Sequence, residues 1–186
     1  MRVCVFCGSS PGRGPGYQDA ARHVGRVFAE RGIELVYGGA SVGTMGVIAD
    51  AVLDAGGVAH GVIPQSLVDR EVAHTGLTTL KVVADLHERK AAMSELADAY
   101  LTLPGGAGTL EELFEVFTWA QLGLHEKPIA LLDVAGYYQP MMRFLENMTA
   151  EGFLADDFRS MLIVTTEVTE ALDRFAEYRP PRTKWT

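Results

Sequence analysis

A glycine loop with two carboxylates behind it is the part of this sequence best suited to chemistry. Residues 103–112 read Leu-Pro-Gly-Gly-Ala-Gly-Thr-Leu-Glu-Glu. The apolar run at 99–103 is typical of a buried strand, and apolar residues recur at helical spacing after the loop, at Leu110, Leu113, Phe114 and Phe117. Glycines let the backbone approach a ligand, and unpaired N–H groups at a helix start favour an anion. The loop therefore predicts a phosphate site with carboxylates beside it.

The same residues also fit an ordinary helix start. Thr109 and Glu112 have the Thr-x-x-Glu spacing of a capping box, so this segment alone does not choose between the two interpretations. Neighbouring residues lie about 100° apart around a helix, so Glu111 and Glu112 face different directions. Glu111 shares a stripe with Glu115 and Thr118, and Glu112 lies on another. Helix geometry leaves open which carboxylate faces a ligand.

Two adjacent cations are the second chemical signal. In the helix expected over 86–97, the stripe that normally faces a core comprises positions 86, 89, 90, 93, 96 and 97. Arg89 and Lys90 belong to this stripe, and an inward charge is costly unless it is paired. We therefore expect both to meet an anion, either a bound phosphate or the nearby carboxylates. The structural alternative is that both side chains extend outward and only pack their stems.

Short apolar runs alternate with segments of helical periodicity. The expected strands are 3–6, 33–37, 58–63, 79–83, 99–103, 129–132 and 161–164. The expected helices are 17–31, 44–55, 86–97, 110–122 and 138–151. This alternation predicts an α/β fold built on a doubly wound, mostly parallel sheet with helices on both faces.

Three glycine-rich loops follow expected strands, at residues 7–12, 38–46 and 104–109. In this fold class all three gather at the carboxyl edge of the sheet, where open α/β sheets bind ligands. No loop continues as the Gly-Lys-Ser/Thr of a Walker motif, and the first lacks Gly-x-Gly-x-x-Gly spacing. A ligand the size of a mononucleotide therefore fits better than a dinucleotide.

Length and charge limit the remaining possibilities. The chain has 186 residues, and we expect a single domain over 1–178 with a peripheral tail over 179–186, where two prolines prevent a helix from continuing. The net charge of -8 argues against a general nucleic-acid binder. No apolar run reaches the roughly 20 residues that span a bilayer, and the start shows no signal-peptide pattern. We expect a cytoplasmic protein without membrane partners.

Cys4 and Cys7 have Cys-x-x-Cys spacing but no second ligand pair. Side chains alternate along a strand, so the two would point to opposite faces unless the strand ends between them. We interpret them as small buried apolar residues rather than a redox or zinc site, and we expect no metal.

The two chemical motifs resemble a known signature. Residues 104–112 match P-G-G-x-G-T-x-x-E, and residues 86–90 match M-H-x-R-K with Leu86 in place of Met. Together they resemble the Lonely Guy family, cytokinin riboside 5'-monophosphate phosphoribohydrolases long misannotated as lysine decarboxylases. The resemblance includes 38–46, 70–74 and 118–123 and runs from residue 4 to about residue 153.

The resemblance implies a Rossmann-like fold, a homodimer with its site near the interface, no cofactor, and hydrolysis of a purine nucleoside 5'-monophosphate to free base and ribose 5-phosphate. Arg89 and Glu112 match the family's catalytic pair, so the family pattern selects the carboxylate that helix geometry could not. The positions implied to contact substrate are Gly39, Gly43, Met45, Glu71, Lys90, Gly105, Gly106, Ala107, Gly108, Thr109, Leu110, Glu111 and Thr118.

Two other functions compete with this hypothesis. A lysine decarboxylase would need pyridoxal phosphate on a lysine, and no lysine here has a recognisable cofactor context. A non-catalytic nucleotide-binding or carrier protein could use the same fold and loop, although the pair of Arg89 and Glu112 favours an enzyme. Both AMP and an N6-prenylated AMP stay open as the substrate, because no residue identifies the wall that meets an apolar tail.

Overall fold

The computed structural model describes residues 1–70, 72–181 and 183 and contains one seven-stranded sheet. Its strands are β1 (Arg2–Phe6), β2 (Glu34–Tyr37), β3 (Ala59–Pro64), β4 (Thr79–Val83), β5 (Ala99–Thr102), β6 (Ile129–Leu132) and β7 (Leu162–Thr165). Their order is β4-β3-β2-β1-β5-β6-β7, and every neighbouring pair is parallel. The predicted α/β class is confirmed. Strands of this kind read as continuous apolar runs because both faces of the sheet are covered.

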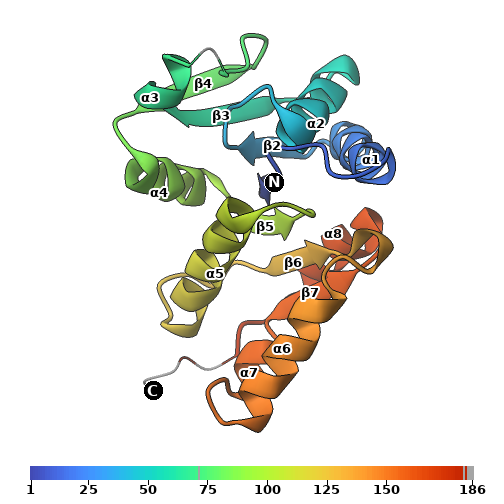
Figure 1. The fold of residues 1–186 in the computed structure, drawn as a ribbon, viewed down its shortest axis with the longest axis vertical. Coiled ribbons are helices and arrows are strands. Elements are labelled where there is room, and N and C mark those ends of the chain that lie inside the picture. The colour runs from blue at the N-terminus through green and yellow to red at the C-terminus, as the bar shows by residue number, and fades with distance from the viewer. Residues whose placement is uncertain (71, 182, 184–186) are drawn as a thin grey trace.

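The helices lie on both faces of the sheet (Figure 1). They are α1 (Gly16–Glu30), α2 (Gly43–Asp54), α3 (Gln65–Val68), α4 (Leu86–Leu96), α5 (Ala107–Gln121), η1 (Val134–Gly136), α6 (Gln139–Ala150), α7 (Asp156–Arg159) and α8 (Val168–Glu177). Helices α1, α2 and α8 bury their apolar sides on one face, and α4, α5, α6 and α7 bury theirs on the other. Among the described residues, no helix is long and apolar enough to cross a membrane.

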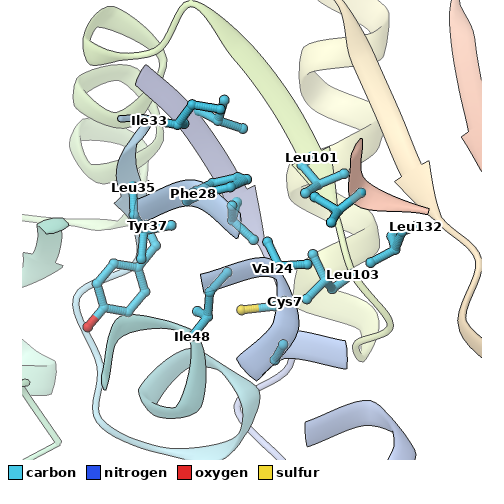
Figure 2. Close-up of a cluster of buried hydrophobic side chains, with 14 of the residues drawn as sticks. Cys7, Val24, Phe28, Ile33, Leu35, Tyr37, Ile48, Leu101, Leu103 and Leu132 are labelled. Atoms are coloured by element: carbon cyan, nitrogen blue, oxygen red, sulfur yellow. The ribbon is translucent and has the colours of Figure 1, made fainter. Parts of the chain in front are cut away.

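The two faces have separate cores, and the cysteines belong to different ones. Cys7 packs with Phe28 and Leu103 in the core under α1, α2 and α8 (Figure 2). Cys4 packs with Tyr100 in the core under α4 and α5. Both thiols are free and buried, and burial raises the pKa of each. The expected apolar role on opposite faces is confirmed.

Most elements lie where the sequence pattern predicts them, and α5 is the informative exception. It begins at Ala107, three residues before the expected start, with Gly106 as its N-cap and no capping side chain. Thr109 therefore lies inside the first turn, and the capping-box interpretation is wrong. Helix α8 was missed altogether, although its apolar positions Val168, Ala171, Leu172 and Phe175 are buried at helical spacing.

The strand order reverses between β1 and β5, which are direct neighbours at the centre of the sheet. Chain connections run toward β4 on one side and toward β7 on the other, and the loops after β1 and β5 diverge at this point. Open α/β sheets bind ligands in the crevice that such a reversal creates. The topology therefore places the first and third glycine loops at the crevice.

The second glycine loop is tied to the first by close backbone contact. Thr44, at the start of α2, donates from its N–H and its hydroxyl to the carbonyl of Gly8, at 3.1 and 3.0 Å. Gly43 has φ +58°, and a Cβ there would lie 2.4 Å from the carbonyl carbon of Ser9. Position 43 therefore requires glycine for its conformation and for the approach of the two loops.

We predict that Gly43→Ala destabilises the protein more than Gly56→Ala does. Both glycines have positive φ, Gly43 as the first residue of α2 and Gly56 just after its end, but a Cβ at Gly56 meets nothing within 4 Å. Gly56→Ala should cost about 1–2 kcal/mol of unfolding free energy from backbone strain alone. Gly43→Ala should cost roughly 1–3 kcal/mol more, because it also forces the first loop away. Urea unfolding measures both, and equal losses would contradict this account of the loop contact.

Candidate functional site

A cavity of about 290 Å³ opens at the carboxyl ends of β1, β2 and β5. All three glycine loops contribute to its wall, through Ser9, Gly38, Met45 and residues 106–109. Helix α4 adds Arg89 and Lys90, and the first turn of α5 adds Glu111 and Glu112. The predicted convergence of the loops, the basic pair and the acidic pair is confirmed.

The third glycine loop presents backbone donors to this cavity. The first hydrogen bond of α5 runs from the N–H of Leu110 to the carbonyl of Gly106, at 3.2 Å. The N–H groups of residues 107–109 precede that bond and have no partner within the helix. A Cβ at Gly105 would lie 2.1 Å from the hydroxyl oxygen of Thr109, so glycine lets the loop fold back on the buried threonine. This arrangement suits a phosphate or another small anion.

The guanidinium of Arg89 is fixed by the sheet. Asp85 caps α4 by accepting hydrogen bonds from the N–H groups of His87 and Glu88, at 2.8 and 2.9 Å, which sets where the helix begins. Arg89 donates from Nε to the carbonyl of Val62 at 3.1 Å and from Nη2 to that of Gly38 at 2.9 Å.

The Arg89 site also depends on the lack of a side chain at position 38. A Cβ there would lie 1.6 Å from Nη2. Glycine at this position therefore leaves the space that the guanidinium occupies. The two carbonyls accept hydrogen bonds from Nε and Nη2 only, so neither of them holds Nη1.

Glu112 is a buried carboxyl facing that guanidinium. Its side chain is 14% exposed, and its Oε1 lies 4.0 Å from Nη1 of Arg89. Burial raises the pKa of Glu112 to about 7, and the positive charge of Arg89 opposes that rise. A carboxyl with a pKa near neutrality in a cleft is a candidate for catalysis, because it can change protonation state or stabilise a nearby cation.

Lys90 points to the other carboxylates of α5. Its ammonium donates to Glu111 and, at 3.0 Å, to Glu115. Burial lowers the pKa of Lys90, but the hydrogen bonds to the two carboxylates outweigh burial and leave it raised. Arg89 and Lys90 thus face different stripes of α5, and the prediction that nearby carboxylates pair with these cations is confirmed.

The other described residues that were expected to contact substrate do not line this cavity. Gly105 borders a neighbouring cavity of about 180 Å³. Those outside the cavity wall are Gly39, Gly43, Leu110 and Thr118. Leu110 packs against the core under α5, and the hydroxyl of Thr118 donates to the carbonyl of Phe114 at 2.7 Å. Glu71 lies outside the described residues, as do positions 182 and 184–186 of the expected tail.

Sequence reasoning assigned two features of the site incorrectly or not at all. Leu86 was expected to face the core, but as the first residue of α4 it is 55% exposed and lines the cavity. Tyr137, whose hydroxyl donates to the carbonyl of Gly105, was not identified. No local pattern around position 137 connects it with the glycine loop 32 residues earlier.

Comparison with known proteins agrees with this geometry. A family model described as possible lysine decarboxylase matches residues 45–175. The cytokinin riboside 5'-monophosphate phosphoribohydrolase LOG of Oryza sativa subsp. japonica is 50% identical over 179 residues, which is 96% of this chain and 74% of the rice protein. The chain belongs to the Lonely Guy family.

A second Lonely Guy relative, LOG7 of Arabidopsis thaliana, is 48% identical over 96% of this chain and 82% of its own length. The structure of the molybdenum cofactor carrier protein from Chlamydomonas reinhardtii superposes with a TM-score of 0.70 at 19% identity, over 95% of this chain and 96% of that chain. At 19% identity, the likeness to the carrier protein shows the fold alone.

We predict that Glu112→Gln stabilises the ligand-free protein at high pH. The carboxyl has an ordinary pKa of 4.5 and a folded pKa of about 7, so the folded state keeps the proton within this window. Wild-type stability therefore falls as pH rises from 4.5 to 7, whereas glutamine stays neutral. The variant should exceed wild type by about 1–3 kcal/mol near pH 8 and match it near pH 4.

Urea unfolding of both proteins at the two pH values measures the difference. Glu95→Gln, at an exposed position of α4, is the matched control and should show no pH-dependent gain. A gain for Glu112→Gln that is the same at both pH values would contradict the assigned burial cost.

Proposed function

We propose that this protein is a hydrolase that cleaves the N-glycosidic bond of purine nucleoside 5'-monophosphates, releasing free base and ribose 5-phosphate. The substrates are cytokinin riboside 5'-monophosphates, AMP, or both. The observation that carries the proposal is the buried carboxyl of Glu112 beside the fixed guanidinium of Arg89, one helical turn from a loop that offers backbone donors to a phosphate. The activities in the names of the rice and Arabidopsis relatives support this reaction.

The catalytic roles follow from charge. Breaking the bond between C1' and the purine develops positive charge on the sugar, which the ionised carboxylate of Glu112 stabilises, as carboxylates do in glycosidases. The same carboxylate orients or deprotonates the attacking water. Arg89 favours the ionised form of Glu112 and offers Nη1, which neither carbonyl holds, to the phosphate or the carboxylate through charge-assisted hydrogen bonds.

The phosphate binds at the start of α5 in this proposal. The N–H groups of residues 107–109 and the positive end of the helix dipole attract it, and the cavity then receives the sugar between this loop and Glu112. Phosphate binding therefore fixes the distance between C1' and the carboxylate. Lys90 and Glu111 form the adjoining wall and contact the rest of the nucleotide.

A homodimer with the site near its interface completes the proposal. Three leucines are exposed on or beside α4 and α5, the helices that carry the charged residues: Leu86 at 55%, Leu122 at 41% and Leu124 at 68%. Phe117, by contrast, belongs to the protein's own core. Burial of the leucines against a second copy would extend the cavity wall.

Light scattering should give about twice the chain mass of 20.1 kDa, and an active monomer would refute this assembly.

We predict that the protein releases adenine from AMP at least roughly 10²-fold faster than from adenosine, as kcat/KM. The phosphate supplies the binding energy that positions the sugar at Glu112, and adenosine lacks it. Chromatographic detection of adenine measures both rates. Equal rates would contradict the phosphate site, and AMP that binds but stays intact would favour the carrier function.

A further inference from the structure

Lys90 pairs with two carboxylate groups, although its ammonium carries a single positive charge. Its ammonium, on a side chain that is 11% exposed, contacts both Glu111 and Glu115. These residues are four positions apart on α5 and so lie on the same side of the helix, one turn from each other. One carboxylate is sufficient to neutralise one ammonium. The second is in excess when the site holds no ligand.

The two carboxylates differ in access to the cavity. Glu111 lines the cavity and its side chain is 58% exposed, so it can rotate toward a ligand. Glu115 is 23% exposed and does not line the cavity. Its Oε2 is buried without a hydrogen-bond partner among the described residues. Lys90 is thus the cation that Glu115 contacts in the described part of the chain, whereas Glu111 is exposed enough to meet a ligand.

We propose that Glu115 is a positioning residue that holds Lys90, so that Glu111 can leave the ammonium and accept a hydrogen bond from the substrate. An ionised carboxylate only accepts hydrogen bonds, so the group it meets is a hydroxyl or amino donor of the nucleotide. The inference rests on the proposed function. It adds a division of labour: Glu115 keeps Lys90 neutralised throughout, and Glu111 exchanges partners when substrate binds.

A purely structural role predicts something different. If both carboxylates only tie α4 to α5, the loss of either one affects stability and leaves substrate affinity unchanged. If Glu115 frees Glu111, its loss forces Glu111 to stay on Lys90, which weakens substrate binding although Glu115 does not touch the cavity. The loss of substrate affinity must then vanish when position 90 is replaced by an uncharged residue.

The experiment is a double-mutant cycle between Glu115→Gln and Lys90→Met. Glu115→Gln alone should raise KM and Kd for AMP about tenfold, the size expected for one charge-assisted hydrogen bond, with kcat within about threefold of wild type. In the Lys90→Met background the same change should alter both constants less than about twofold. Glu95→Gln, on the exposed side of α4, is the control and should match wild type.

Each outcome decides the inference. A Glu115→Gln variant with wild-type KM and Kd overturns it, as does an equal loss in both backgrounds. Lys90→Gln replaces Lys90→Met if thermal unfolding shows that the latter does not fold. Calorimetric Kd separates the two proposals: if wild type binds AMP with the expected cycle but releases no adenine, the proposed function fails and the inference stands. Failure of wild type to bind AMP overturns both.

Discussion

The burial of one carboxyl group beside one guanidinium is the constraint on which the rest of the site depends. Glu112 is removed from water far enough for its pKa to rise to about 7, and Arg89 at 4.0 Å limits that rise. A charged pair at this separation needs its cation held in place, or the guanidinium would move into solvent. The carbonyls of Gly38, directly after β2, and of Val62, within β3, supply that restraint. By holding Arg89, the sheet therefore influences the pKa of Glu112 on α5.

The topology explains why these groups meet. The reversal of strand order between β1 and β5 opens a crevice, and the chain returns to it from β4 through α4. Lys90 on α4 therefore reaches the carboxylates of α5, which begins after the glycine loop that follows β5. Glycines at the contact points let the backbones of the loops touch, as Gly43 does against Ser9. A cavity with donors on one side and carboxylates on the other is the consequence.

The sequence predicts the sheet, the convergence of the glycine loops and the pairing of α4 cations with α5 carboxylates, because these follow from periodicity and parallel strand order. It does not predict where α5 begins, since Gly106 caps the helix without a side chain and leaves no capping signal. It also does not predict that Arg89 donates to the backbone carbonyls of Val62 and Gly38, or that Lys90 takes Glu111 and Glu115 as its two partners. Such partners are set by tertiary contacts between residues more than 20 positions apart, which local patterns do not encode.

In the proposed reaction, Glu112 provides charge for catalysis rather than for binding. Calorimetry and adenine release on one preparation of Glu112→Gln separate the two roles, because glutamine preserves the size of the side chain and removes its charge. We expect near wild-type affinity for AMP with hydrolysis lowered about 10²–10³-fold, the usual cost of losing one preorganised electrostatic group. Wild-type turnover by Glu112→Gln, together with loss of turnover in Glu111→Gln, would contradict it and assign the reaction to the neighbouring stripe of α5.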